Sequence, residues 1–106
     1  MTNTGLNDSD IKKIQTVLNL HQEIEKAILF GSRAKGNYKP ASDIDLTLVG
    51  DELTLTIQQK IENELDDLLL PYKFDISIYH TISSNELVEH IERVGQLFFQ
   101  KEKANS

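Results

Sequence analysis

The feature that most restricts how this chain can fold is the segment 30–46, which reads FGSRAKGNYKPASDIDL. An apolar run ends there in Gly31 and Ser32, and a glycine at that place lets the backbone turn sharply or approach a ligand closely. Ten residues separate Ser32 from Asp43, and Asp43 and Asp45 then flank one isoleucine in a second strand-like run. The segment therefore predicts a phosphate-binding turn that faces a site for a divalent metal.

The two aspartates are expected on one face of a strand. Alternate side chains of a strand point to the same side, so Asp43 and Asp45 share a face while Ile44 and Leu46 are buried on the other. Two steps of about 3.3 Å place their Cα atoms roughly 6.5 to 7 Å apart. Magnesium takes hard oxygen ligands, usually one or two carboxylates together with phosphates and water. A site for two ions, about 3.5 to 4 Å apart, is expected to use a third carboxylate.

Asp75 is the candidate for that third carboxylate. The stretch 74–79 alternates strictly, with Asp75 on the opposite face from Phe74 and Ile76. If this strand lies beside the first acidic one, about 4.8 Å away, Asp75 can reach the same ions. The alternative is that all three aspartates are the solvated face of half-buried strands. Aspartate is a poor strand former, which favours the functional interpretation.

The turn and the loop after it contain candidate phosphate ligands. The exposed amides of a turn at Gly31 and the hydroxyl of Ser32 suit phosphate oxygens. The alternative is an ordinary turn in which Ser32 caps a helix. Arg33, Lys35 and Lys39 follow within seven residues, and their cations could meet triphosphate oxygens or could form a solvated basic loop.

The whole pattern resembles the nucleotidyltransferase superfamily typified by DNA polymerase β. Its signature is an apolar residue, Gly-Ser or Gly-Gly, roughly ten residues, and then Asp-apolar-Asp, and the segments 30–32 and 43–46 fill every position. The longer string GSRAKGNYKPASDIDL is similar to the minimal nucleotidyltransferases. These small prokaryotic proteins are paired, as antitoxins of toxin-antitoxin systems, with a helical HEPN-domain partner.

The resemblance implies a polymerase β-like nucleotidyltransferase fold and a metal-dependent reaction. The expected activity is transfer of AMP from ATP to a tyrosine hydroxyl of a HEPN toxin, with two Mg²⁺ ions as cofactors. The catalytic and metal-binding residues would be Asp43, Asp45 and Asp75. The nucleotide-binding residues would be Gly31 and Ser32. Arg33 and Lys35 are added as candidates because of their positive charge.

Two other functions stay open at this point. The domain could neutralise its partner by steric occlusion, holding nucleotide without turnover. The consecutive apolar residues Leu97, Phe98 and Phe99 motivate this alternative, because one face of a helix cannot bury all three. The domain could also modify a small molecule, although no segment is left to form an acceptor-binding domain.

Composition sets the outer limits. The chain has 106 residues, of which 39% are hydrophobic, and it is expected to form a single domain over 1–106. It has no cysteine, which fits a reducing cytoplasm, and no apolar run longer than four residues, so neither a membrane span nor a signal peptide is expected. The net charge of −6 argues against direct binding of nucleic acid.

The expected fold is a small α/β (α+β) domain with a mixed three-stranded sheet. Its elements are a helix capped by Asp8 or Ser9, strands at 26–30, 43–49 and 74–79, a short helix after Gly31, a helix ended by Pro71, and a last helix over 84–100. The last helix carries a stripe of Leu87, Ile91, Val94 and Phe98. His21 is expected at the edge of the core.

Overall fold

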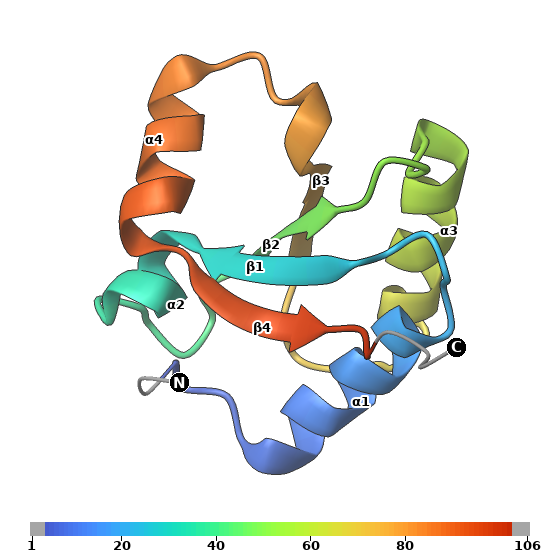
Figure 1. The fold of residues 1–106 in the computed structure, drawn as a ribbon. Coiled ribbons are helices and arrows are strands. Elements are labelled where there is room, and N and C mark those ends of the chain that lie inside the picture. Colours follow the sequence, from blue (N-terminus) through green and yellow to red (C-terminus); the bar gives the residue numbers. More distant parts are fainter. Residues whose placement is uncertain (1–3, 103–106) are drawn as a thin grey trace.

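The computed structural model describes residues 4–102, and these form one sheet with helices around it (Figure 1). The elements in chain order are α1 (Asp8–Asn19), β1 (Lys26–Phe30), α2 (Gly31–Lys35), β2 (Ile44–Val49), α3 (Leu55–Asp66), β3 (Phe74–Ile78), the 3₁₀ turn η1 (Tyr79–Thr81), α4 (Asn85–Val94) and β4 (Gln96–Gln100). Among the residues described, no helix combines the length and the apolar content needed to cross a bilayer.

The sheet has the strand order β3-β2-β1-β4. β1 runs antiparallel to both β2 and β4, whereas β3 runs parallel to β2. Parallel neighbours need a crossover connection, and α3 supplies it between β2 and β3. The expected mixed sheet is therefore confirmed, with β2 and β3 side by side.

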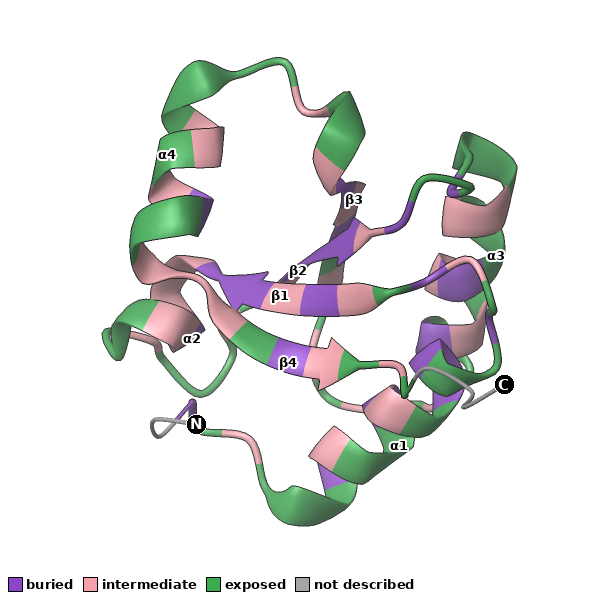
Figure 2. Ribbon diagram, in the orientation of Figure 1, coloured by how far each residue is buried: buried purple, intermediate pink, exposed green. Residues whose placement is uncertain are grey.

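One face of the sheet builds the main core. Alternate residues of the strands point to this face, which is why buried and less buried positions alternate along β1 in Figure 2. Helices α1 and α3 contact each other, and they pack on β4 and β3 respectively. The buried apolar residues of this core include Ile14, Leu18, Leu29, Leu46, Leu48, Ile61, Leu65, Ile76 and Phe98. The other face carries polar side chains on β2 and β3, whereas its part on β1 includes the apolar residues Ile28 and Phe30 and is contacted by α4.

The first helix begins at Asp8, which is one residue before the start that a cap at Asp8 would give. Asn7 is the N-cap, and its side-chain oxygen accepts a hydrogen bond of 2.8 Å from the N–H of Asp10. Asn, Asp and Ser are all good caps, so the run Asn7-Asp8-Ser9 leaves the choice to tertiary packing. The predicted caps Asp8 and Ser9 are both inside the helix.

His21 lies at the edge of the core, as predicted. It is buried, and its Nε2 lies 2.7 Å from Oε1 of Glu64 in α3. The contact ties the end of α1 to α3. Glu64 is therefore a partner of a buried ring.

The predicted last helix over 84–100 is wrong in its second half. α4 ends at Val94, and residues 96–100 form β4, so the sheet has four strands instead of the expected three. Gly95 takes extended dihedral angles, and its N–H still donates to the carbonyl of Ile91 at 2.8 Å. The helical stripe ended at Phe98, but Phe98 is equally well buried as the inward residue of a strand. Pairing with β1 decided between the two.

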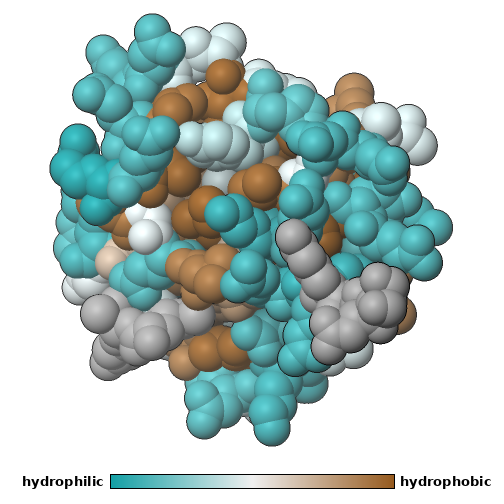
Figure 3. All heavy atoms as spheres, in the orientation of Figure 1, coloured by the Kyte–Doolittle hydropathy of each residue, from teal (hydrophilic) through white to brown (hydrophobic). Residues whose placement is uncertain are grey.

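The strand accounts for the apolar residues that one helix face could not bury. Phe98 is 2% exposed, whereas its neighbour Leu97 points to the other side of the sheet and is 52% exposed. Apolar side chains gather near the middle of the face seen in Figure 3, over which β1 and β4 run in Figure 1. Fewer apolar side chains are therefore exposed in 97–99 than the sequence indicated.

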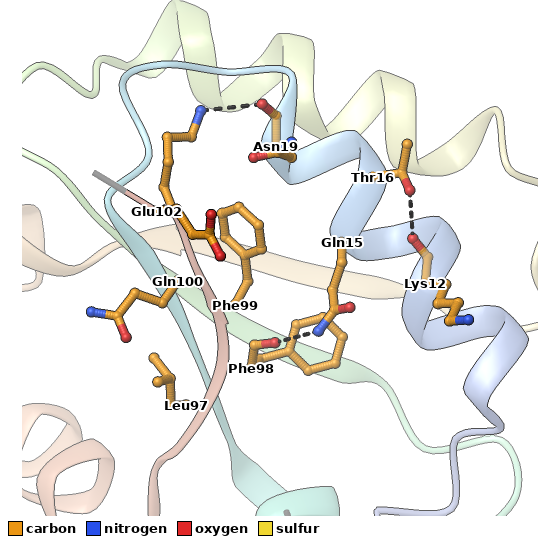
Figure 4. A pocket seen from close by; sticks show the side chains of 10 residues that line it. Lys12, Gln15, Thr16, Asn19, Leu97, Phe98, Phe99, Gln100 and Glu102 are labelled. Carbon is orange, nitrogen blue, oxygen red and sulfur yellow. Dashed lines mark hydrogen bonds between the residues drawn. The ribbon is translucent and has the colours of Figure 1, made fainter. Parts of the chain in front are cut away.

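Figure 4 looks into a hollow of about 830 Å³ between α1 and β4. Gln15 of α1 reaches across it, and its Nε2 donates to the carbonyl oxygen of Phe98 at 2.8 Å. None of the predicted site residues lines this hollow. The candidate chemistry lies at another place, at the end of β1 and the beginning of β2.

Candidate active site

The centre of the candidate site is a pair of aspartates on adjacent strands. Asp45 of β2 and Asp75 of β3 are direct partners in the parallel register. Asp43 lies two residues before Asp45 and is exposed just ahead of β2. The three predicted carboxylates are thus brought to the same end of the sheet.

The carboxyl group of Asp45 has an unusual environment. Its pKa is raised from 3.8 to about 6. Burial is the largest cause, followed by the negative charges of Asp75 and Asp43 and the hydrogen bond with Asp75, while the positive charge of Arg33 acts in the opposite direction. Crowded carboxylates of this kind resist ionisation unless a cation lies among them. The donor set therefore fits a divalent cation.

The three carboxylates do not close around one point. Within residues 4–102, no three His, Asp or Glu side chains lie close enough together to hold a single ion. Asp45 and Asp75 touch each other, whereas Asp43 acts on Asp45 through its charge. The structure therefore supports the predicted neighbourhood of the three residues, and the two-ion arrangement stays a prediction.

Gly31 brings the backbone against the central carboxylate. It follows Phe30, which pairs with Asp45 in the antiparallel register of β1 and β2. Gly31 has a φ of +74°, a left-handed value that glycine adopts without a steric penalty. A Cβ atom at this position would collide with Oδ2 of Asp45. The position directly after β1 therefore favours glycine, since any side chain there would displace Asp45.

Ser32 lies inside the short helix α2 and does not cap it. The cap position belongs to Phe30, whose side chain makes no capping hydrogen bond. The carbonyl of Ser32 accepts the N–H groups of Gly36 at 2.9 Å and of Asn37 at 3.2 Å, which closes the helix. This excludes the alternative of an ordinary turn with Ser32 as N-cap. The predicted contact of Ser32 with phosphate stays a prediction.

Arg33 is placed differently from the predicted phosphate contact. Its side chain is 1% exposed, and its guanidinium donates to the carbonyl oxygens of Thr4, Pro40 and Ser42 at 2.9 to 3.2 Å. The group also lies 5.2 Å from the ring centre of Tyr38 and 4.9 Å from that of Tyr72. Arg33 thus ties the N-terminal segment and the loop before Asp43 to α2.

Lys35 and Lys39 keep their side chains at the surface. Lys35 is exposed in the last turn of α2, and Lys39 is exposed in the loop that leads to β2. Neither position tests the predicted contact with a nucleotide. Both remain candidates for it by charge alone.

The sequence did not point to His90, which also belongs to this corner. Its Nε2 accepts a hydrogen bond of 3.2 Å from the backbone N–H of Gly31. Its ring meets the ring of Phe30 edge to face, with the ring centres 6.1 Å apart and an angle of 81° between the planes. His90 stands 59 residues after Gly31 on α4, and no local pattern connects the two.

Two buried hydroxyl groups continue the acidic face. Thr47 and Ser77 are partners in the same parallel register, one step along from Asp45 and Asp75. Within the described part of the chain, neither Oγ1 of Thr47 nor Oγ of Ser77 has a hydrogen-bond partner. Buried polar atoms of this kind are uncommon in folded proteins. On β2 and β3 this face is therefore polar, in contrast to the apolar core on the opposite side.

Comparison with known proteins gives consistent results. The family profile described as polymerase beta, nucleotidyltransferase, matches residues 12–104. A protein of Methanocaldococcus jannaschii, provisionally named a protein adenylyltransferase, is 33% identical over 87 residues, which are 79% of this chain and 86% of that protein. A Haemophilus influenzae protein, provisionally named the protein adenylyltransferase MntA, is 32% identical over 75 residues, or 70% of this chain and 65% of that protein.

Solved structures share the fold. A crystal structure of a toxin-antitoxin complex with AMP-PNP contains a chain with a TM-score of 0.69 and 21% identity, covering 92% of this chain and 76% of that chain. A second is the complex of a tri-AMPylated HEPN toxin with an MNT antitoxin from Shewanella oneidensis. There the TM-score is 0.67 and the identity 16%, with 91% of this chain and 74% of that chain covered. At these identities the likeness shows the fold alone.

Proposed function

The chain belongs to the polymerase beta nucleotidyltransferase family, and from this premise we propose that it transfers AMP from ATP to a hydroxyl group of a partner protein, a tyrosine of a HEPN-domain toxin. One observation carries the proposal. Asp45 and Asp75 are direct partners on adjacent strands, with Asp43 two residues before Asp45 and Gly31 against the carboxylate of Asp45.

The choice of nucleotide and acceptor is supported by the relatives. The two similar curated proteins carry provisional protein adenylyltransferase names. One structural neighbour was solved with the ATP analogue AMP-PNP, and another with a tri-AMPylated HEPN toxin. Transfer of AMP to a protein is thus the activity that best fits this chain, and a HEPN toxin is the partner class that these complexes suggest.

Asp43, Asp45 and Asp75 are the residues that would hold Mg²⁺. Their carboxylate oxygens are the ligands that magnesium prefers, and the raised pKa of Asp45 reflects its burial first and then the negative charges of Asp75 and Asp43. Bound magnesium would lower the pKa of the attacking hydroxyl and neutralise the pyrophosphate that leaves. In nucleotidyl transfer most of the rate comes from such positioning and charge stabilisation.

The remaining residues would place the nucleotide. Gly31 keeps the backbone close to Asp45, and Ser32 offers a half-buried hydroxyl next to it for the triphosphate. Lys35 would meet phosphate from the surface as a point charge. Arg33 would act indirectly, because its guanidinium already holds the loop that leads to Asp43. The exposed carboxylate of Asp75 would accept the proton of the acceptor hydroxyl.

The test is a transfer assay with α-labelled ATP, MgCl₂ and a HEPN-domain protein encoded in the same genome. We expect label on the HEPN protein, at a tyrosine that mass spectrometry identifies. Asp43→Asn and Asp45→Asn should each lower the rate by about 100-fold or more, because each removes a metal ligand. Asp51→Asn is the matched control, since Asp51 is an exposed aspartate in the turn after β2 and lies outside the site. Absence of label, or equal rates for Asp45→Asn and Asp51→Asn, would refute the proposal.

The non-catalytic alternative has lost most of its motivation. It rested on three consecutive apolar residues near the C-terminus, but Phe98 belongs to the core and only Leu97 is more than half exposed. The same assay separates the two functions, since an occluding antitoxin transfers no label.

A further inference from the structure

Helix α4 contacts the corner of the candidate site, and one of these contacts is made by a ring nitrogen of His90. Nε2 of His90 accepts the backbone N–H of Gly31 at 3.2 Å, and for this it must present a lone pair, with the ring proton on Nδ1. Gly31 determines the geometry of this corner, because the chain changes direction between β1 and α2 at its φ of +74°. The hydrogen bond therefore fixes the orientation of the peptide that precedes Gly31.

This contact is one step away from the central carboxylate. The Cα of Gly31 lies against Asp45, so closely that a Cβ atom would collide with Oδ2. A rotation of the Gly31 peptide would move this Cα and change the space that the carboxylate occupies. His90, Gly31 and Asp45 thus form a continuous line of contacts from α4 to the acidic pair.

The imidazole is itself held in place. Its ring packs edge to face against Phe30, which is 7% exposed. The next residue of α4, Ile91, is 3% exposed, so this turn of the helix is anchored to the sheet side. At the start of the helix, Oγ of Ser84 accepts the N–H of Leu87 at 3.2 Å. His90 is therefore a packed side chain with a defined direction and not a mobile surface histidine.

We propose that His90 is a positioning residue of the active site, which holds the Gly31 peptide so that Asp45 keeps its place beside Asp75. It touches neither the acidic pair nor the reacting groups in this arrangement and acts through Gly31. The claim that His90 holds the Gly31 peptide stands on the contacts alone. The claim that this hold affects the reaction rate rests on the proposed function.

Two substitutions separate the hydrogen bond from the packing. His90→Gln keeps an acceptor, because the side-chain oxygen of Gln is as many bonds from Cα as Nε2 of His. His90→Phe keeps a ring against Phe30 and removes the acceptor. His90→Leu serves as a second acceptor-free variant if His90→Phe fails to fold, and circular dichroism checks the fold of each.

The first measurement is the rate of label transfer to the HEPN protein. His90→Phe should lower kcat/KM by about 3- to 10-fold, which corresponds to one lost hydrogen bond, mainly through kcat and with little change in the KM for ATP. His90→Gln should stay within about twofold of the wild type, because the acceptor is restored. A purely structural role would not produce this rescue. Equal rates for His90→Phe and the wild type, or equal losses in both variants, would overturn the inference.

The second measurement does not need activity. The backbone amide of Gly31 is followed by ¹⁵N-resolved hydrogen exchange in the free protein. We expect a slow exchange in the wild type and in His90→Gln, and a faster one in His90→Phe. If the wild type labels no acceptor but the Gly31 amide behaves in this way, the proposed function fails and the hold of His90 on Gly31 stands. If the exchange is the same in all three proteins, the His90 inference fails whatever the activity.

Discussion

The contact between Gly31 and Asp45 is a tight local constraint in the candidate site. Gly31 follows β1 as the first residue of α2 and Asp45 lies on the neighbouring strand β2, and the missing side chain of one makes room for the carboxylate of the other. Two separate features favour glycine at position 31. Its φ of +74° is left-handed, and the space that a Cβ atom would occupy is filled by the carboxylate of Asp45. Gly36 has only the first feature, because its φ is +85° and nothing lies within 4 Å of a Cβ placed there.

This difference gives a matched pair of substitutions. Gly36→Ala should lower the free energy of unfolding by about 1 kcal/mol, the cost of a left-handed conformation for a residue with a Cβ. Gly31→Ala carries the same cost and must also displace Asp45, so we expect a total loss of about 2 to 4 kcal/mol. Urea denaturation of both variants measures it. Equal losses would mean that the collision with Asp45 is relieved without cost.

A second prediction concerns the charge of Asp45. Its pKa is about 6 in the folded protein against an ordinary value of 3.8, so between these pH values the folded state keeps a proton that the unfolded chain has released. Stability must then fall as the pH rises from about 4 to 6 and stay lower above that window. Asp45→Asn removes the cost of the ionised form. In EDTA at about pH 7.5 this variant should melt roughly 2 to 5 °C higher than the wild type, a modest value because solvent screens a half-buried group.

The advantage of Asp45→Asn should disappear below about pH 4, where Asp45 is protonated in both states. Thermal melts at several pH values test this, with Asp51→Asn as the control at an exposed position. A gain that is independent of pH would assign the effect to packing and not to charge. The variant is expected to be more stable and inactive, since the group that destabilises the metal-free protein is the group proposed to bind the metal.

At the scale of elements, β4 is where sequence and structure diverge. Its residues follow α4 directly after Gly95, and they alternate between the core and the other face. Phe98 is 2% exposed and Leu97 is 52% exposed, although the two are adjacent. Phe98→Ala should therefore cost about 3 to 5 kcal/mol of unfolding free energy, and Leu97→Ala less than about 1 kcal/mol. Chemical denaturation measures both, and similar losses would contradict the strand.

The sequence was sufficient where local pattern and tertiary packing agree. Strand 26–30 was predicted with its observed bounds, and alternation in 43–49 and 74–79 located β2 and β3 to within a residue. The same alternation put Asp45 and Asp75 on one face. For 96–100 the pattern allowed two solutions, because Phe98 ends a helical stripe and also suits a strand. Pairing with β1, some 70 residues earlier, favours the strand. A pattern within 96–100 contains no information about so distant a partner.

Two features of the site could not be predicted for the same reason. Arg33 was expected to face phosphate because it is a cation in the right loop, but the carbonyls of Thr4, Pro40 and Ser42 converge on it and draw it inside. Which of several neighbouring cations folds inward depends on these distant groups. His90 had no signal, since its role comes from the way α4 packs on α2 and β1.

On the scale of the whole molecule, the acidic site exists only in the folded sheet. Asp45 and Asp75 are separated by α3 in the chain and meet because β3 pairs parallel to β2. A cation bound by both must therefore stabilise the fold as a whole, by an amount that grows with its concentration. Because the net charge is −6, any salt also stabilises the protein by screening the repulsion between its negative charges. Stabilisation by a bound cation must be measured apart from this screening.

We expect about 10 mM MgCl₂ to raise the melting temperature of the wild type by a few degrees beyond NaCl at the same ionic strength. Asp75→Asn should lose most of this difference, because one ligand is gone and the remaining charge is lower. Differential scanning fluorimetry measures both proteins side by side. An equal magnesium effect in the two would show that the ion binds elsewhere.

The two-sided character of β2 has a consequence for how such a chain can evolve. Its residues at positions 45 and 47 lie on the acidic face, and those at 44, 46 and 48 lie in the core. Replacing a residue disturbs one side only, but gaining or losing one residue within the strand would exchange the two sides for everything beyond it. Selection should therefore tolerate many substitutions in β2 and almost no indels, whereas the loop 36–42 should drift in length more freely.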